Sequence, residues 1–339
     1  MQDHSVTINS KNMFQVSVIV PAKNAGASID ACLNALRNQD YPAEKYEIIV
    51  VNDGSTDNTV TLATPYARVI TQSPKGPAAA RNLGAAYANG DILLFTDADC
   101  QPERQWISKM IKRFEDPAVA GVKGVYTTDQ SSTVAQFVQI EYEGKYNYML
   151  QFPEIDFIDT YSAGFRKKVF LQMNGFDESF PGASVEDQEF SFRIHEAGYK
   201  MRFAPEASVK HLHAATICRY AIKKFRIGYW KVKVLKRHPR KSLHDTHTPP
   251  WLKIQIPLAF LSLVFVFTIF VTGWIPAILF LAMFIGSAAN ELADCIKKGT
   301  WRLRLMAPLL LYLRALSLGS GLIFGFIQSK ASKRIESIT

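Results

Sequence analysis

The strongest constraint on this chain lies in its C-terminal third, where three long apolar stretches follow one another. Residues 254–272 and 274–290 contain no charged side chain, and residues 305–328 contain only Arg314. Because a bilayer core about 30 Å thick is crossed by about 20 apolar helical residues, stretches of this length are typical of membrane helices. Buried helices of a soluble core are the alternative, but no amphipathic helices follow that would cover them. We therefore expect a transmembrane region over residues 254–328, with segments 254–272, 274–293 and 305–328.

Basic residues are concentrated in the same part of the chain. Residues 1–218 carry 20 basic and 26 acidic side chains, whereas residues 219–339 carry 19 basic and 4 acidic ones. Within residues 216–253, apolar residues recur every three or four positions from Cys218 to Leu235, surrounded by Lys and Arg. Such a helix lies in a membrane interface, held by apolar burial and by anionic lipids. We expect an interfacial linker here and no nucleic acid partner, since apolar segments follow directly.

Residues 14–215 have the pattern of an α/β domain. Three short apolar runs each end in turn residues: Val16–Val20, Glu47–Val51 and Asp91–Thr96. Residues with helical spacing stand between them, for example in Ile29–Gln39. Alternating strands and helices predict a mostly parallel sheet flanked by helices, and continuous apolar strands suit a sheet buried on both faces. Residues 1–13 form a polar tail without the apolar segment of a cleavable signal peptide.

Polar clusters follow these three predicted strands. They are Pro21-Ala22-Lys23-Asn24, Asn52-Asp53-Gly54-Ser55-Thr56-Asp57 and Asp97-Ala98-Asp99. Ligands of open α/β sheets bind beyond the carboxyl ends of the strands, so the clusters mark one candidate binding edge. Neither the GxGxxG nor the GxxxxGK[ST] pattern occurs, which argues against a dinucleotide-binding fold and against a P-loop.

Asp97 and Asp99 are candidates for a metal site. Side chains two apart on an extended chain point to the same side, and carboxylate oxygens beside a diphosphate suit Mg²⁺ or Mn²⁺. Gln101, two residues further, is a weaker candidate that would add a carbonyl ligand. An isolated Asp-x-Asp is more often a solvated turn, but the neighbouring strand-end clusters favour the metal.

Asp53 and Arg81 can each be interpreted in two ways. Asp53 at a strand end can accept hydrogen bonds from a nucleotide base or a ribose, although Asn-Asp-Gly-Ser also favours a turn by itself. Arg81 stands in a helix rich in Ala and Gly. It can contact a diphosphate or lie on a solvated helix face, and the residues alone leave this open.

Taken in order, four segments resemble the inverting glycosyltransferases of family 2: VSVIVPAKN, EIIVVNDGSTDNT, AARNLGAAYANGDILLFTDADC and GFDESFPGASVEDQEFSFRIHEAGY. The similarity spans about Phe14 to His213 and implies the A-type fold of nucleotide-diphospho-sugar transferases. By the same resemblance, the donor-binding residues are Pro21, Ala22, Lys23, Asp53, Arg81 and Asp97. The metal ligands are Asp97 and Asp99, with His211 as a weak further candidate, and Gly164 and Asp177 shape the acceptor side.

The resemblance also assigns Asp187, in the Glu186-Asp187 pair, as the catalytic base. Negative charge grows on the departing diphosphate, and a divalent cation neutralises it. A carboxylate on the opposite face of the sugar takes the proton of the acceptor hydroxyl, so that attack inverts the anomeric centre. Pattern alone would also explain Asp187 as an ordinary acid in the first turn of a helix.

These features predict a membrane glycosyltransferase that uses a nucleotide-sugar donor, a UDP-sugar by resemblance, and a lipid-linked or cell-envelope glycan acceptor. Nucleotide sugars and basic loops are both cytosolic, so we expect the catalytic domain on the cytosolic side of the inner membrane. Two crossings return the chain to the basic residues 297–304. A third crossing by segment 305–328 would place Lys330, Lys333 and Arg334 of the basic tail, 329–339, outside, against the positive-inside tendency. A bend at Gly319-Ser320-Gly321 or a position in the interface are the other possibilities.

Three other functions fit part of the sequence. A polyisoprenyl-phosphate glycosyltransferase needs no strong base, and Gln101 resembles the DxDxQ pattern of that group, whereas the Glu186-Asp187 pair points away from it. A processive polysaccharide synthase is disfavoured because no Gln-x-x-Arg-Trp motif occurs. A non-catalytic membrane protein that binds a nucleotide sugar is the alternative from another class, and the complete set of Asp97, Asp99 and Asp187 argues for chemistry instead.

Overall fold

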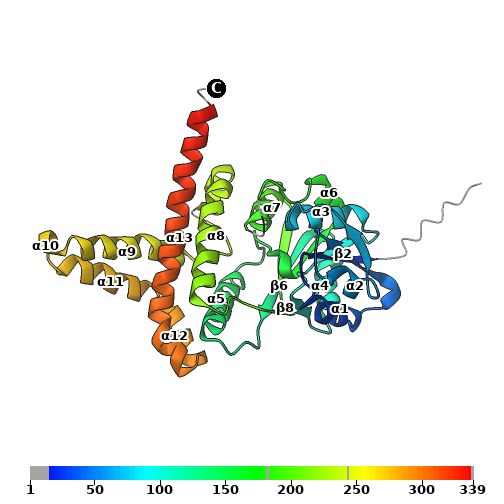
Figure 1. Cartoon of the computed structure of the whole chain (residues 1–339), viewed down its shortest axis with the longest axis horizontal. Helices are drawn as coiled ribbons and strands as arrows, with labels where there is room; N and C mark the ends of the chain where they lie inside the picture. The colour runs from blue at the N-terminus through cyan, green and yellow to red at the C-terminus, as the bar shows by residue number, and fades with distance from the viewer. Residues whose placement is uncertain (1–14, 181, 183, 243, 337–339) are drawn as a thin grey trace, which may run out of the picture.

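The computed structural model describes residues 15–336, except residues 181, 183 and 243, so the expected tail 1–13 lies outside the described residues. The molecule is elongated (Figure 1). A sheet covered by helices lies at one end, and the pair of helices formed by residues 250–287 extends away at the other end. Between them stand two long helices, built from residues 217–237 and 301–336.

One eight-stranded sheet has the order β3-β2-β1-β4-β7-β6-β8-β5. The strands are β1 Val16–Ala22, β2 Tyr46–Asn52, β3 Arg68–Thr71, β4 Ile92–Phe95, β5 Cys100–Pro102, β6 Val119–Thr127, β7 Ala163–Arg166 and β8 Lys200–His211. Strands β1 to β4 pair in parallel, as the sequence predicts, because each follows a helix or a loop that crosses over. Strand β7 runs antiparallel to both β4 and β6. The α/β fold with a mixed sheet is therefore confirmed.

Helices cover both faces of this sheet. Those of the sheet domain are α1 Ile29–Arg37, α2 Thr59–Ala63, α3 Pro77–Tyr87, α4 Trp106–Lys112, α5 Thr133–Met149, α6 Lys167–Gln172 and α7 Glu186–Glu196. Helix α3 approaches the sheet closely, since a Cβ at Gly84 would lie 2.5 Å from Cγ2 of Ile19. This contact explains the Ala- and Gly-rich sequence of α3. It also fixes the buried side of the helix, from which Arg81 projects.

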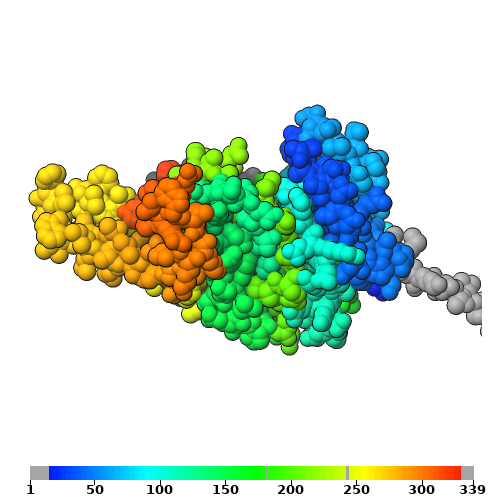
Figure 2. Space-filling view, turned by 90° about the horizontal axis from the view of Figure 1, so that it is seen from below, coloured from blue at the N-terminus to red at the C-terminus, as the bar shows by residue number. Residues whose placement is uncertain are grey.

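The C-terminal part is helical. Its helices are α8 Ile217–Arg237, α9 Pro250–Phe267, α10 Ile269–Thr272, α11 Ile275–Ser287, α12 Ala289–Lys298 and α13 Trp301–Glu336. Two of them, Pro250–Phe267 and the Trp301–Ser329 part of α13, are long and apolar enough to cross a membrane. The pair α11 and α12, bent by 59°, counts as a third if it forms one span. Figure 2 shows α12 beside α5, which places these helices directly against the sheet domain.

Helices α8 and α13 pack closely through glycine. A Cβ at Gly321 would lie 2.1 Å from the carbonyl oxygen of Phe225, and one at Gly228 would lie 2.2 Å from that of Leu318. Small residues permit such an approach between helices. The apolar stripe of α8 that the sequence assigns to a membrane interface therefore covers α13 at Phe225 and Tyr229. Its helical nature is as predicted, part of the stripe packs on α13, and its location in a membrane interface stays a prediction.

Helix α13 also corrects two expectations about the third apolar segment. It continues without a bend through residues 319–321, because Gly319 and Gly321 face Phe260 and α8 rather than a turn. It extends to Glu336, so most of the expected basic tail belongs to the helix. The predicted segments 254–272 and 274–293 form a hairpin of α9 and α11, and α11 ends at a bend near Ala288.

The hairpin presents apolar side chains to its surroundings. Phe270 is 100% exposed and Val271 89% exposed at the tip, and neither α9 beyond Lys253 nor α11 carries a charge. Exposed apolar surface on this scale marks an interaction site in a soluble protein or a lipid-facing surface. In Figure 1 the hairpin points across the direction of α13, away from the sheet domain.

Arg314 connects this hairpin to the sheet domain. It is 1% exposed and donates to Glu141 of α5 at 2.9 Å and to Glu291 of α12 at 2.7 Å. It also donates to the side chain of Gln255 in α9. The single charge in the apolar segment 305–328 thus holds four helices together.

We expect Arg314→Leu to destabilise the protein by about 3–5 kcal/mol, because it leaves Glu291, whose side chain is only 15% exposed, without its cationic partner. The measurement is thermal unfolding of the detergent-solubilised protein. Arg302→Leu removes an exposed charge from the same helix and should change stability by no more than about 0.5 kcal/mol. Equal unfolding temperatures of the two variants would contradict the role of Arg314.

Candidate functional site

A cavity of about 580 Å³ lies where the sheet domain meets α8 and the segment before α9. Its walls include Asp97 and Asp99, which follow β4, and Glu186 and Asp187 from the start of α7. All four carboxylates were predicted from the sequence. The cavity thus brings together two strand-end acids and two acids from a helix that begins almost 90 residues later in the chain.

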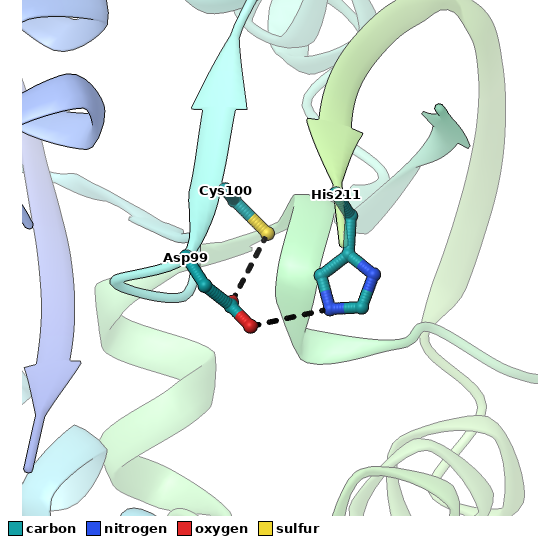
Figure 3. A group of neighbouring side chains, drawn as sticks. All are labelled: Asp99, Cys100 and His211. Atoms are coloured by element: carbon teal, nitrogen blue, oxygen red, sulfur yellow. Dashed lines mark hydrogen bonds and ion pairs between the residues drawn. The ribbon is translucent and has the colours of Figure 1, made fainter. Parts of the chain in front are cut away.

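Asp99 lies beside a histidine from another strand. Figure 3 shows Asp99, Cys100 and His211, and the Nε2 atom of His211 is 3.6 Å from Oδ2 of Asp99. The pairing of β5 with β8 sets Cys100 opposite His211, which brings these residues together. The His211 ring stacks on Tyr126 with centroids 4.5 Å apart, and this contact orients the imidazole.

The electrostatics of this group suit a divalent cation. Burial and the charge of Asp97 raise the pKa of Asp99 to about 6, so two carboxylates repel each other here. Burial and the charge of Lys223 lower the pKa of His211 to about 4, which leaves a neutral imidazole able to bind a metal. Burial keeps the pKa of the Cys100 thiol well above its usual value, so this sulfur stays protonated. Carboxylate oxygens suit Mg²⁺ and Mn²⁺, whereas an imidazole suits transition metals, so a set that includes His211 favours Mn²⁺ over Mg²⁺.

Gln101 is placed differently from the prediction. It is exposed on β5, pairs in register with Lys210, and does not line the cavity. Asp99 lies in a turn and strand β5 begins only at Cys100, so the two-residue period of a strand does not extend from Asp99 to Gln101. The weak assignment of Gln101 as a metal ligand is therefore wrong in this structure.

Arg81 links the two groups of acids. It is 2% exposed and donates to Asp97 at 2.7 Å and to Glu186 at 3.1 Å. The guanidinium thus lies inside the site and not on a solvated helix face, and its contact with a diphosphate stays a prediction. Glu186 also accepts a hydrogen bond from the backbone of Ser184 at 2.9 Å, so its carboxylate is fully engaged.

Asp187 differs from its neighbour Glu186. Among the described residues it accepts one hydrogen bond, from the backbone of Gln188 at 2.7 Å, and has no cation within ion-pair distance. Burial, with the negative charges of Glu186 and Asp159, raises the pKa of Asp187 well above its usual value. A carboxylate with a raised pKa that lines a cavity is suited to accept a proton.

The predicted donor residues at the other strand ends lie outside this cavity. Pro21 and Ala22 end β1, and Lys23 lies 3.9 Å from Asp53. Asp53 is 4% exposed and accepts hydrogen bonds from the backbone of Lys75 at 2.7 Å and of Gly76 at 3.0 Å. It thus fixes the loop that enters α3, and its base-binding role stays a prediction.

Neither acceptor-side candidate lines the cavity. A Cβ at Gly164 would lie 2.8 Å from Leu94, so this glycine belongs to the core of the sheet. Asp177 ion-pairs with Arg237, which is on α8, and accepts a hydrogen bond from Ser179 at 2.8 Å. Gly164 therefore serves packing, and Asp177 connects the sheet domain to α8. This corrects the assignment of both residues to the acceptor side.

The sequence missed the basic wall of the cavity. Arg219, Lys223 and Arg226 from α8 line it together with Lys145 from α5. Their spacing along α8, four and then three residues, places them on one helical face and is the signal that was available. The sequence assigned these charges to anionic lipids because it could not show that this face of α8 meets the catalytic cavity.

Comparison with known proteins gives a consistent result. Residues 17–173 match the model of "Glycosyl transferase family 2". The glycosyltransferase AglE of Haloferax volcanii is 29% identical over 232 residues, which cover 65% of this chain and 73% of AglE. Several other curated glycosyltransferases are matched over only about half of their own length.

Two further proteins are similar. One is the Methanococcus voltae enzyme named dolichyl N-acetyl-alpha-D-glucosaminyl phosphate 3-beta-D-2,3-diacetamido-2,3-dideoxy-beta-D-glucuronosyltransferase, 26% identical over 62% of this chain and 69% of that protein. The other is a solved structure, mannosyltransferase PcManGT from Pyrobaculum calidifontis in complex with GDP-Man and Mn²⁺. It has a TM-score of 0.59 and 19% identity, and the match covers 92% of this chain and 87% of that one, so the likeness shows a shared fold.

Proposed function

We propose that this chain is a member of glycosyl transferase family 2 that transfers a sugar, with inversion, from a nucleotide-diphosphate donor to a hydroxyl group of a membrane-associated glycan acceptor. The observation that carries the proposal is the arrangement of acids in one cavity. Arg81 engages Asp97 and Glu186, while Asp187 remains without a cationic partner among the described residues. In this proposal the donor site and the proton acceptor Asp187 lie in the same cavity.

The roles of the residues follow from this arrangement. Asp99 and His211, with Asp97 beside them, would hold a divalent cation, which when bound would offset the negative charge of the donor diphosphate. Arg81 forms an ion pair with Asp97 and holds that side chain in place. Asp187 accepts the proton of the acceptor hydroxyl, and Glu186, held by Arg81, keeps the start of α7 oriented toward the cavity. The PcManGT structure contains Mn²⁺ and GDP-Man, which supports a metal-dependent reaction with a nucleotide-sugar donor.

A membrane location is part of the proposal. The exposed apolar hairpin of α9 and α11 would insert into the bilayer and keep the cavity close to its surface. The M. voltae relative is named for a dolichyl-phosphate-linked sugar, which supports a lipid-linked acceptor. We propose that the sheet domain faces the cytosol, where nucleotide sugars are made.

The test is a panel of nucleotide sugars supplied to the purified, detergent-solubilised protein with Mn²⁺, with release of the nucleoside diphosphate as the readout. We expect slow release with one donor, accelerated by a membrane lipid extract that contains the acceptor. Donor binding without release, with every donor and with the extract present, would favour the non-catalytic binding protein.

The pH dependence of turnover follows from Asp187. A base acts only when it is deprotonated, and the pKa of Asp187 is raised well above its usual value of about 4. Activity should therefore fall as the pH drops through this raised pKa and should be full above it. We expect kcat measured between about pH 5 and 9 to show an acid limb well above the ordinary range of an aspartate. A flat profile over this range would contradict the assignment.

A further inference from the structure

The cavity holds more cationic groups than its own carboxylates neutralise. Glu141 is paired with Lys224 at 3.0 Å and with Arg314 at 2.9 Å. Asp159 forms an ion pair with Lys123, and both Asp97 and Glu186 form ion pairs with Arg81. The unpaired cations of the wall are Lys145, Arg219, Lys223, Arg226 and Lys231. Among the described residues, none of these five has a carboxylate oxygen within 4.0 Å.

Two of these cations are also withdrawn from water. Lys145 contacts Nε2 of His247 at 3.4 Å, and Lys231 donates to Oγ1 of Thr248 at 3.5 Å. Burial lowers the pKa of both lysines and places that of His247 well below its usual value. Asp245, the acid nearest in sequence to His247, is already paired with Lys253 at 3.0 Å. Glu141 and Asp159 act on Lys145, and Asp245 acts on Lys231, without an ion-pair contact among the described residues. Because a partly buried ammonium group without an ion-pair partner is costly, an anionic ligand would remove that cost.

The unpaired cations divide into two groups along α8. Lys223 lies near the candidate metal site, because its charge acts on Asp99 and His211. Lys145 and Lys231 lie at the opposite end, where both act on His247. This second group adjoins the start of the apolar hairpin, since Leu252 of α9 lines the same cavity.

We infer that Lys145, Lys231 and His247 form a second anion subsite, which binds a phosphate ester carried by the acceptor. The inference rests on the proposed function and specifies its acceptor as a lipid-phosphate-linked saccharide. The phosphate lies at the base of the hairpin, the lipid follows the apolar surface of α9, and the sugar extends toward Asp187. The donor diphosphate binds at the other group of cations, which includes Lys223 and lies next to Asp99.

The experiment compares two ligands on the detergent-solubilised full-length protein. The first is farnesyl phosphate, with farnesol as its uncharged counterpart, and the second is the nucleoside diphosphate of the active donor with Mn²⁺. Lys145→Gln and Lys231→Gln should each weaken farnesyl phosphate about 10- to 100-fold, with nucleotide affinity changed less than about twofold. Retained nucleotide binding also shows that the variants are folded. Lys231→Arg, which keeps the charge, should retain most of the affinity.

Lys236→Gln is the matched control, because it removes a charge from the same helix outside this cavity. An equal loss of nucleotide affinity in both test variants would assign these cations to the donor and overturn the inference. It would also be overturned if wild-type protein bound farnesyl phosphate no better than farnesol, while nucleotide binding and donor cleavage remained intact. Absence of nucleotide binding and of donor cleavage in wild-type protein would instead reject the proposed function itself.

Discussion

Asp187→Asn is expected to lower kcat by about 10²- to 10⁴-fold while leaving donor affinity nearly unchanged. The amide has almost the same size and shape as the carboxylate, but it cannot accept the proton of the acceptor hydroxyl. Arg81, Asp97 and Glu186 keep their ion pairs in this variant, so the donor side of the cavity stays intact. The measurement is turnover with saturating donor and acceptor, together with an independent nucleotide-binding assay.

Asp30→Asn is the matched control for this variant. Asp30 also stands in the first turn of a helix, α1, but outside the cavity, and should give wild-type turnover. Near-normal turnover of Asp187→Asn would mean that the acceptor is already ionised. The protein would then be a polyisoprenyl-phosphate glycosyltransferase, in which the acceptor phosphate attacks directly.

Asp99→Asn is expected to lower kcat/KM by about 10²- to 10³-fold, because the cation that offsets the diphosphate charge loses an anionic ligand. The loss should be partly recovered by raising the Mn²⁺ concentration, which separates a ligand role from a folding defect. His211→Ala should weaken Mn²⁺ as well, since its imidazole lies 3.6 Å from Asp99. Both are measured as activity against Mn²⁺ concentration.

Glu103→Gln serves as the control for the metal variants, because Glu103 is an exposed acid just after β5 and outside the cavity. We expect its Mn²⁺ dependence to equal that of the wild type. If Asp99→Asn showed an unchanged Mn²⁺ requirement and normal activity, the cation would not be bound at the end of β4.

The candidate site was predictable where its residues stand next to recognisable strands. Asp97 and Asp99 follow an apolar run, so their place at the carboxyl edge of the sheet could be derived from local pattern. The ion pair between Arg81 and Glu186 joins residues 105 positions apart, and no spacing rule gives such a contact. Gly164 and Asp177 were misplaced for the same reason, because their surroundings come from distant elements.

The same difference between local sequence pattern and long-range contacts applies to the membrane part. The uncharged length of residues 254–290 and the basic character of α8 determined by themselves that this region is helical and apolar, since composition and periodicity are local properties. Only the tertiary structure shows which face of α8 meets α13 and how Arg314 joins four helices. It also shows that Lys145 and Lys231 line the same cavity as Asp187. Charge and hydropathy patterns give the kind of surface that a helix presents, but the partner of that surface depends on contacts between residues far apart in the chain.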